Sequence, residues 1–200
     1  MNAQAPNAHT PPTLSEVFAS APGDAGPAAF ALAHLGPGAR VLWVQDRASR
    51  REGGRPYAPA LAVDLLHLEV AKAVDALWAM EQALSCGTLA AVVGEVWGEA
   101  RALDFTATKR LALRAERAGV AAWLLRGTAA PDLSAARERW RVVSVAGGAW
   151  RAVLLRSRFR PPAEWVARAE GGRLLFVRAR PEAVPEALPA EARGAPPRAA

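Results

Sequence analysis

Residues 73–93 read AVDALWAMEQALSCGTLAAVV, and this stretch decides the fold class. Ala73, Leu77, Met80 and Leu84 recur at helical spacing, and Gly87 is the residue type that commonly ends a helix. The run that follows, residues 89–93, is apolar throughout, which is typical of a strand covered on both faces of a parallel sheet. A helix followed at once by such a strand predicts an α/β protein.

The same alternation continues on both sides of this stretch. Short apolar runs predict further strands at residues 14–18, 40–45, 64–70 and 121–125. Helical patterns predict a short helix that ends near Leu35, one or two helical turns at residues 59–63, and a long helix from Asp104 to Ala118 that ends before Gly119. Residues 46–56 are polar, and we expect them to form a loop.

After Pro131 the pattern changes to strands joined by tight turns. Alternating runs predict strands at residues 140–145, 150–159, 164–169 and 173–177, with glycine pairs at 147–148 and 171–172 where hairpins turn. We therefore expect an α/β core, with a mostly parallel sheet flanked by helices and extended by antiparallel C-terminal strands. The domain is expected at residues 14–178, between a disordered lead (1–13) and a disordered Pro/Ala-rich tail (179–200).

The composition excludes several kinds of site. Cys86 is the only cysteine, so neither an internal disulfide nor a multi-cysteine zinc site can form. The histidines His9, His34 and His67 match no metal-ligand spacing, and we expect no metal and no cofactor. No apolar run reaches about 18 residues and no secretory signal precedes residue 14, so we expect a cytoplasmic protein with no membrane contact. We expect Cys86, Trp78 and Met80 in the core.

The positive charge is concentrated in one stretch. The chain carries a formal net charge of +6, and residues 134–160 hold seven arginines against one glutamate, which accounts for the whole excess. A local basic patch of this kind favours contact with nucleic acid or with an acidic partner.

Three segments carry a likeness to a known family: DALWAMEQALSCGTLAAVVGEVWG (75–98), LDFTATKRLALRAERAGVAAWLLR (103–126) and SAARERWRV (134–142). Together they resemble ImuA proteins, which are RecA-like accessory factors of mutagenic translesion synthesis in bacteria. The resemblance covers residues 15–177. It implies a RecA-like core for the α/β domain. It also implies a role in DNA repair after DNA damage, within the SOS response, as part of a mutasome with an ImuB-like Y-family protein and an error-prone C-family DNA polymerase.

The nucleotide site that a RecA-like domain would carry lacks its chemical groups. A P-loop has the form GxxxxGK[ST], and the matching stretch here is EVFASAPGDAGPAAFAL (16–32). Gly23 and Gly26 remain, whereas Pro27 stands in place of the lysine and Ala28 in place of the Ser/Thr. The carboxylate expected after the strand at 89–93 is absent, because Gly94 stands there and Glu95, one residue on, faces the other side. Asp46 is the remaining candidate to orient water, so we expect a domain that does not hydrolyse ATP.

The strongest candidate interface is the predicted strand WRAVLLRSRFRP (150–161). Strict alternation would place Arg156, Arg158 and Arg160 on one face, about 6.6–6.8 Å apart, which is close to the phosphate repeat of an extended single strand. Three interpretations stay open: the row binds single-stranded DNA, it docks on RecA in the manner that the resemblance implies, or it is a solvated edge strand protected by its charge.

Two further groups are candidates for contact. One group stands at the start of the first strand predicted after Pro131 and consists of Arg137, Arg139 and Trp140. These residues either bind DNA or a partner, or Trp140 belongs to the core and the two arginines are solvated at its rim. Trp97, in the predicted loop 94–98, is either an exposed anchor or a plug that fills the empty nucleotide site.

These observations predict a non-catalytic RecA-like adaptor for protein–protein interaction in SOS mutagenesis. Two alternatives stay open. One is an SOS cell-division inhibitor that resembles SulA and binds FtsZ. The other is a DNA-dependent ATPase with a degenerate P-loop.

Overall fold

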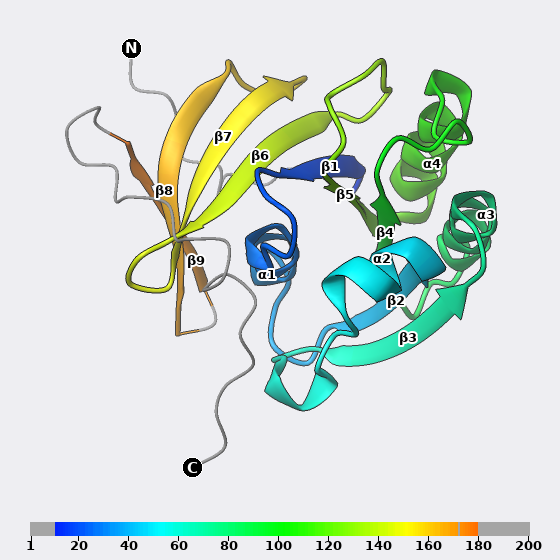
Figure 1. Ribbon diagram of the computed structural model, residues 1–200, viewed down its shortest axis with the longest axis horizontal. Helices are drawn as coiled ribbons and strands as arrows, with labels where there is room; N and C mark the ends of the chain where they lie inside the picture. The colour runs from blue at the N-terminus through cyan, green and yellow to red at the C-terminus, as the bar shows by residue number, and fades with distance from the viewer. Residues whose placement is uncertain (1–10, 172, 180–200) are drawn as a thin grey trace.

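A computed structural model describes residues 11–171 and 173–179 (Figure 1). Within these residues one sheet has nine strands, in the order β3-β2-β4-β5-β1-β6-β7-β8-β9. The strands are β1 (Leu14–Ala19), β2 (Arg40–Asp46), β3 (Asp64–Val70), β4 (Ala91–Trp97), β5 (Ala121–Gly127), β6 (Glu138–Val145), β7 (Ala149–Ser157), β8 (Ala163–Glu170) and β9 (Arg173–Arg178). The helices are α1 (Gly26–Ala33), α2 (Arg47–Gly53), α3 (Ala73–Ala83) and α4 (Phe105–Ala118), with one 3₁₀ turn at Ala58–Ala60.

Strand direction divides the sheet into two parts. Every neighbouring pair from β3 across to β6 is parallel, whereas β6 to β9 pair antiparallel. Gly147 and Gly148 turn between β6 and β7 with φ of +77° and +67°, values that favour glycine. The predicted fold class is confirmed: an α/β core with a mostly parallel sheet and helices, extended by antiparallel C-terminal strands.

Helices cover both faces of the parallel part. On one face α3 and α4 bury Leu77, Met80 and Leu111 against apolar side chains of the sheet. On the other face α1 buries Phe30 among Trp140 and other aromatic rings, and β6 to β9 lie beside that helix (Figure 1). Full burial of a side chain such as Phe30 or Leu111 contributes roughly 1.5–3 kcal/mol to the free energy of folding. The apolar clusters on the two faces of the sheet therefore hold the helices against it.

Local capping fixes the ends of α4 as predicted. The Asp104 side chain accepts a hydrogen bond from the Ala107 backbone N–H (2.7 Å), and Gly119 ends the helix with φ +68°. The same chemistry acts at α2, where Asp46 accepts from the Ser49 N–H (2.7 Å). The expectation of a plain loop over residues 46–56 is therefore wrong, because an aspartate cap begins a short helix at Arg47.

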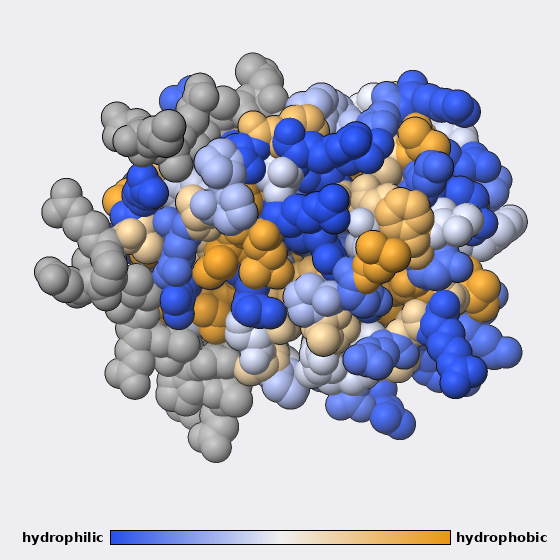
Figure 2. All heavy atoms as spheres, turned by 90° about the horizontal axis from the view of Figure 1, so that it is seen from above, coloured by the Kyte–Doolittle hydropathy of each residue, from blue (hydrophilic) through white to orange (hydrophobic). Residues whose placement is uncertain are grey.

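Two residues predicted for the core lie on the surface instead. Trp78 is 65% exposed on the outer side of α3, whereas Met80 on the same helix is fully buried as expected. Cys86 is exposed beyond the end of α3, and its Sγ lies 3.2 Å from the Thr88 hydroxyl oxygen. Seen from above, the surface shows hydrophobic residues in separate patches between hydrophilic ones (Figure 2).

The predicted ends of the chain fall mostly outside the described residues. Residues 1–10 of the expected N-terminal lead and residues 180–200 of the expected tail are not described. Thr13, at the end of the lead, is buried, and its backbone oxygen accepts a hydrogen bond from the Ala122 N–H (3.0 Å). The ordered part of the fold thus begins before Leu14. Within the described part of the chain, no helix is long and apolar enough to cross a membrane.

Candidate functional site

The expected nucleotide site is a turn between β1 and α1. Gly23 lies in this turn with φ +70°, and Gly26 is the first residue of α1. A strand, a turn and a helix N-terminus in this order form the backbone setting in which P-loops bind phosphate. Gly23, Gly26, Pro27 and Ala28 thus occupy the places that the sequence predicts.

The N-terminus of α1 is already bound to a carboxylate of the protein itself. Asp24 Oδ1 accepts from the Gly26 N–H (2.9 Å) and from the Ser144 hydroxyl (2.6 Å), and Oδ2 accepts from the Ser144 N–H (3.0 Å). A Cβ at Gly26 would stand 2.7 Å from the Ser144 hydroxyl oxygen, so the close approach of α1 to β6 requires glycine. Pro27 has no N–H to offer at the next position. The carboxylate of Asp24 therefore holds donors that a phosphate would need.

The segment 94–97 is strand rather than the predicted loop, because β4 runs on to Trp97. Gly94 faces α3, where a Cβ would collide with the Met80 side chain, so packing against this helix explains the glycine. Glu95 faces the opposite side, as its one-residue offset from Gly94 predicts.

Glu95 is held by two donors from β2. Its Oε2 accepts from the Trp43 indole N–H (3.1 Å) and from the Gln45 amide (3.0 Å). Burial raises the pKa of Glu95 to about 7, against the opposing effect of these two hydrogen bonds. The charge of nearby Asp46 raises this pKa further. Glu95 is therefore a carboxyl group that titrates near neutral pH.

Asp46 has a structural role that the sequence analysis missed. Its side chain is buried and caps α2 through the Ser49 N–H. The predicted assignment of Asp46 as a carboxylate that orients water stays untested, but this cap accounts for the residue at this position.

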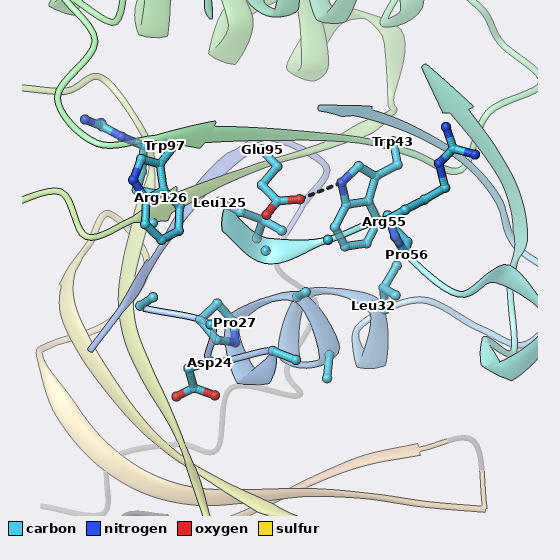
Figure 3. Close-up of a pocket in the computed structure, with 18 of the residues that line it drawn as sticks. Asp24, Pro27, Leu32, Trp43, Arg55, Pro56, Glu95, Trp97, Leu125 and Arg126 are labelled. Atoms are coloured by element: carbon cyan, nitrogen blue, oxygen red, sulfur yellow. Dashed lines mark hydrogen bonds between the residues drawn. The ribbon is translucent and has the colours of Figure 1, made fainter. Parts of the chain in front are cut away.

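A cavity of about 770 Å³ opens beside these residues, between the α1 face of the sheet and the segment that follows α2. Figure 3 shows Glu95 pointing into it, with Trp43 and Trp97 at its two sides. Trp97 forms part of the wall of this cavity, with its indole packed over Gly127, and its role as an anchor or as a plug stays a prediction. The rest of the cavity lining is mainly apolar and comes from α1 and from residues 53–61.

Two of the three candidates Arg137, Arg139 and Trp140 are buried: Trp140 belongs to the core, as one alternative expected, whereas the expectation of a solvated Arg139 is wrong. Trp140 is fully buried among Phe30, Trp165 and Phe176. Arg139 is also buried, and its Nε donates to Glu16 (2.7 Å) while its NH1 donates to the Asp132 backbone oxygen (2.7 Å). Arg137 lies nearer the surface and makes two hydrogen bonds to Glu116.

The predicted row of Arg156, Arg158 and Arg160 is not one face of one strand. β7 ends at Ser157. Its pairing register with β6 shifts by one residue: Arg139 pairs with Arg156, but the next residue, Trp140, pairs with Leu154. Leu155 is the extra residue of this β-bulge, which turns Arg156 to the face that Arg139 occupies. Arg160 instead lies 3.1 Å from Glu138, a residue of the opposite face. The edge-strand interpretation is wrong as well, since β7 lies between β6 and β8.

Ion pairs neutralise much of the basic stretch. Three of its arginines pair with glutamates from other parts of the chain: Arg137 with Glu116, Arg139 with Glu16 and Arg151 with Glu164. A fourth, Arg160, pairs with Glu138 inside the stretch. Arg141, Arg156 and Arg158 are exposed. The candidate interface that remains is this group, and we call it the arginine face.

A buried charged cluster lies behind the arginine face and was missed by the sequence analysis. Glu16 is fully buried in β1 and accepts from Ser134 (2.8 Å) and Arg139 (2.7 Å), while Arg126 NH1 lies 4.0 Å away. Arg126 and Arg139 also lie over the Phe18 ring, at 5.8 and 5.1 Å from its centroid. A glutamate in an otherwise apolar strand was the available signal for this cluster.

Comparison with known sequences identifies no relative. The sequence matches no protein-family model and no curated protein. Among the described residues, no group of three or more His, Cys, Asp or Glu side chains could hold a metal ion.

Proposed function

We propose that this protein is a non-catalytic RecA-like adaptor of SOS-induced, error-prone translesion DNA synthesis in the cytoplasm. Its partners in this proposal are an ImuB-like Y-family protein and an error-prone C-family DNA polymerase. The likeness of segments 75–98, 103–126 and 134–142 to ImuA proteins supports the choice of pathway and partners.

One observation carries the non-catalytic part of the proposal: Asp24 occupies the N-terminus of α1. A bound nucleotide would bring its phosphates to the Gly26 N–H, from which this carboxylate already accepts a hydrogen bond. Two negative groups cannot share this donor without a large electrostatic cost, and the chain has Pro27 where a lysine would offset that cost. In this proposal the domain has a strand, a turn and a helix N-terminus arranged as in a nucleotide site, and it lacks the side chains that bind and hydrolyse a nucleotide.

The arginine face supports contact with RecA or with single-stranded DNA. Arg156 and Arg158 are exposed at the end of β7, and Arg141 is exposed on neighbouring β6. Guanidinium groups on an open sheet face suit either phosphates or a carboxylate-rich protein surface.

Affinity capture from DNA-damaged cells tests this function. The tagged protein is recovered with and without damage, beside a variant with Arg156→Ala and Arg158→Ala and a control with Arg114→Ala and Arg117→Ala on the exposed side of α4. We expect a Y-family-like protein and a C-family polymerase to be captured in a damage-dependent manner. Capture of FtsZ without a polymerase would make the protein a division regulator, and ATP hydrolysis by the purified chain would overturn the non-catalytic assignment.

A further inference from the structure

The cavity beside α1 contains a carboxyl group that an adaptor role leaves unexplained. Glu95 projects from β4 into a space of about 770 Å³, which is within the usual size range of small-molecule sites. The fold does not require a carboxyl group at this position. The single amide oxygen of a glutamine could accept the same two hydrogen bonds from Trp43 and Gln45.

The two oxygens of Glu95 have different surroundings. Oε2 accepts both described hydrogen bonds, from the Trp43 indole and the Gln45 amide. Among the described residues no hydrogen bond reaches Oε1, which lies beside Gly53, where a Cβ would stand 3.2 Å from it. Oε1 is therefore the atom that is available to a molecule inside the cavity.

Within residues 11–171 and 173–179, no charged group stands as a cationic partner for the ionised form of Glu95. Asp46, on β2, adds negative charge, and its effect on the pKa of Glu95 is upward. Arg55 lines the cavity, but its NH2 lies 3.7 Å from Glu69, and its side chain points away from Glu95 in Figure 3. His67 reaches Gln45 at 3.1 Å, and its pKa is lowered by partial burial, which favours the neutral ring.

The remaining charged residues of the lining also face elsewhere. Asp24 points toward Ser144, on the far side of the α1 N-terminus. The Arg126 guanidinium lies near Glu16 and Asp132 on the opposite face of the sheet. The interior of the cavity is thus apolar with a single acidic group, which disfavours anions and favours a cation of low hydration.

We propose that this cavity binds a small, flat aromatic cation of the amidinium or aminoheterocycle type. One N–H of the ligand donates to Glu95 Oε1, and its ring packs against the indole walls formed by Trp43 and Trp97. Such a pair supplies the counter-charge that Glu95 lacks, and an indole face attracts a cation as well as an apolar ring. The proposal goes beyond the adaptor function, and neither depends on the other.

Three ligands of matched shape test the charge requirement: 2-naphthamidine, 2-naphthamide and 2-naphthoate, titrated into the full chain by calorimetry at pH 8. We expect the amidine to bind at least about tenfold more tightly than the amide, and the naphthoate to bind most weakly. Equal affinity for the three, or preference for the naphthoate, overturns the proposal.

The variant Glu95→Gln keeps an acceptor for Trp43 and Gln45 and removes the charge. We expect it to lose at least about tenfold in amidine affinity and to leave amide affinity within about threefold, whereas Glu99→Gln, on an exposed residue, changes neither. A cation binds the ionised form of Glu95, so amidine affinity should rise by about tenfold from pH 6 to pH 8 if the pKa is about 7. Unchanged affinity in Glu95→Gln, or affinity that does not depend on pH, means that the amidine binds elsewhere, which also overturns the proposal.

Discussion

The carboxylate of Asp24 accepts hydrogen bonds from the hydroxyl (2.6 Å) and the backbone N–H (3.0 Å) of Ser144, a residue 120 positions away in the chain. This contact joins the turn before α1 to β6. Asp24 also accepts from the Gly26 N–H at the start of α1 (2.9 Å). One aspartate therefore binds both the first residue of this helix and a distant strand of the sheet.

Asp24→Asn is expected to destabilise the protein by about 1–3 kcal/mol, because an amide N–H₂ would replace one of two oxygens that each face donors. Urea unfolding of Asp24→Asn, Ser144→Ala and the double variant measures the coupling. We expect the two substitutions to be clearly non-additive. Additive effects would mean that the pair does not link α1 to β6.

Glu16→Gln is expected to lower the free energy of unfolding by about 3–5 kcal/mol. Glutamine leaves the guanidinium of Arg139, and that of Arg126 beside it, buried without a full counter-charge. Glu170→Gln removes an exposed partner of Arg168 and serves as the control, with an expected change below about 0.5 kcal/mol. Thermal or urea unfolding measures both, and a similar cost for the two variants would argue against the buried cluster.

Gly94→Ala is expected to destabilise the protein by about 1–3 kcal/mol, because the new methyl group would overlap the Met80 side chain under α3. Shortening that side chain makes room, so Gly94→Ala combined with Met80→Val should be more stable than the sum of the single effects predicts. Gly87→Ala, where a Cβ would meet no atom within 4 Å, is the matched control. Full additivity would contradict the proposed packing.

The contribution of Glu95 to the stability of the protein is expected to fall as pH rises from about 4.5 to about 7. Glu95 holds its proton up to a pKa of about 7 in the folded state, whereas the unfolded chain releases it near the ordinary glutamate pKa of 4.5. The unfolded state therefore binds fewer protons in this window, and folding becomes less favourable as pH increases. Urea unfolding across pH 4.5–8 should show that Glu95→Gln removes this contribution and is more stable than the parent at pH 8. The opposite slope for the difference between the two proteins would contradict the raised pKa.

Replacing Arg156 and Arg158 with alanine is expected to weaken single-stranded DNA binding and its salt dependence together. Each lost phosphate contact changes the slope of log affinity against log salt by about 0.7. Fluorescence anisotropy at several salt concentrations measures this slope. Arg160→Ala should leave it unchanged, because Arg160 lies against Glu138 on the other face. An equal loss of slope in Arg160→Ala would restore the single row that the structure contradicts.

The α/β class, the long helix α4 and the succession of strands along the chain follow from patterns that the sequence shows locally. The caps Asp104 and Gly119 act within one helical turn, so their positions alone predict where α4 begins and ends. Pro27 and Ala28, at positions where a P-loop would have Lys and Ser/Thr, are also visible in sequence. The position of Glu95 opposite Gly94 follows from the strand period of two.

Other features arise from contacts between distant parts of the chain. The arginine row fails because the bulge at Leu155 changes the strand period, and a bulge depends on the pairing partner. Trp78 has the spacing of a helical residue near the core, yet only the placement of α3 on the sheet decides that its side chain faces solvent.

The sequence by itself determined the existence of the five parallel core strands and of the helices α1, α3 and α4, since these depend on residues close together in the chain, whereas α2 was not predicted. The tertiary structure decided which charges remain available. Arg139 meets Glu16, Arg137 meets Glu116 and Asp24 meets Ser144 across separations of 123, 21 and 120 residues. The net charge of a segment carries no information about such partners, because electrostatic pairing depends on distance in space and on burial.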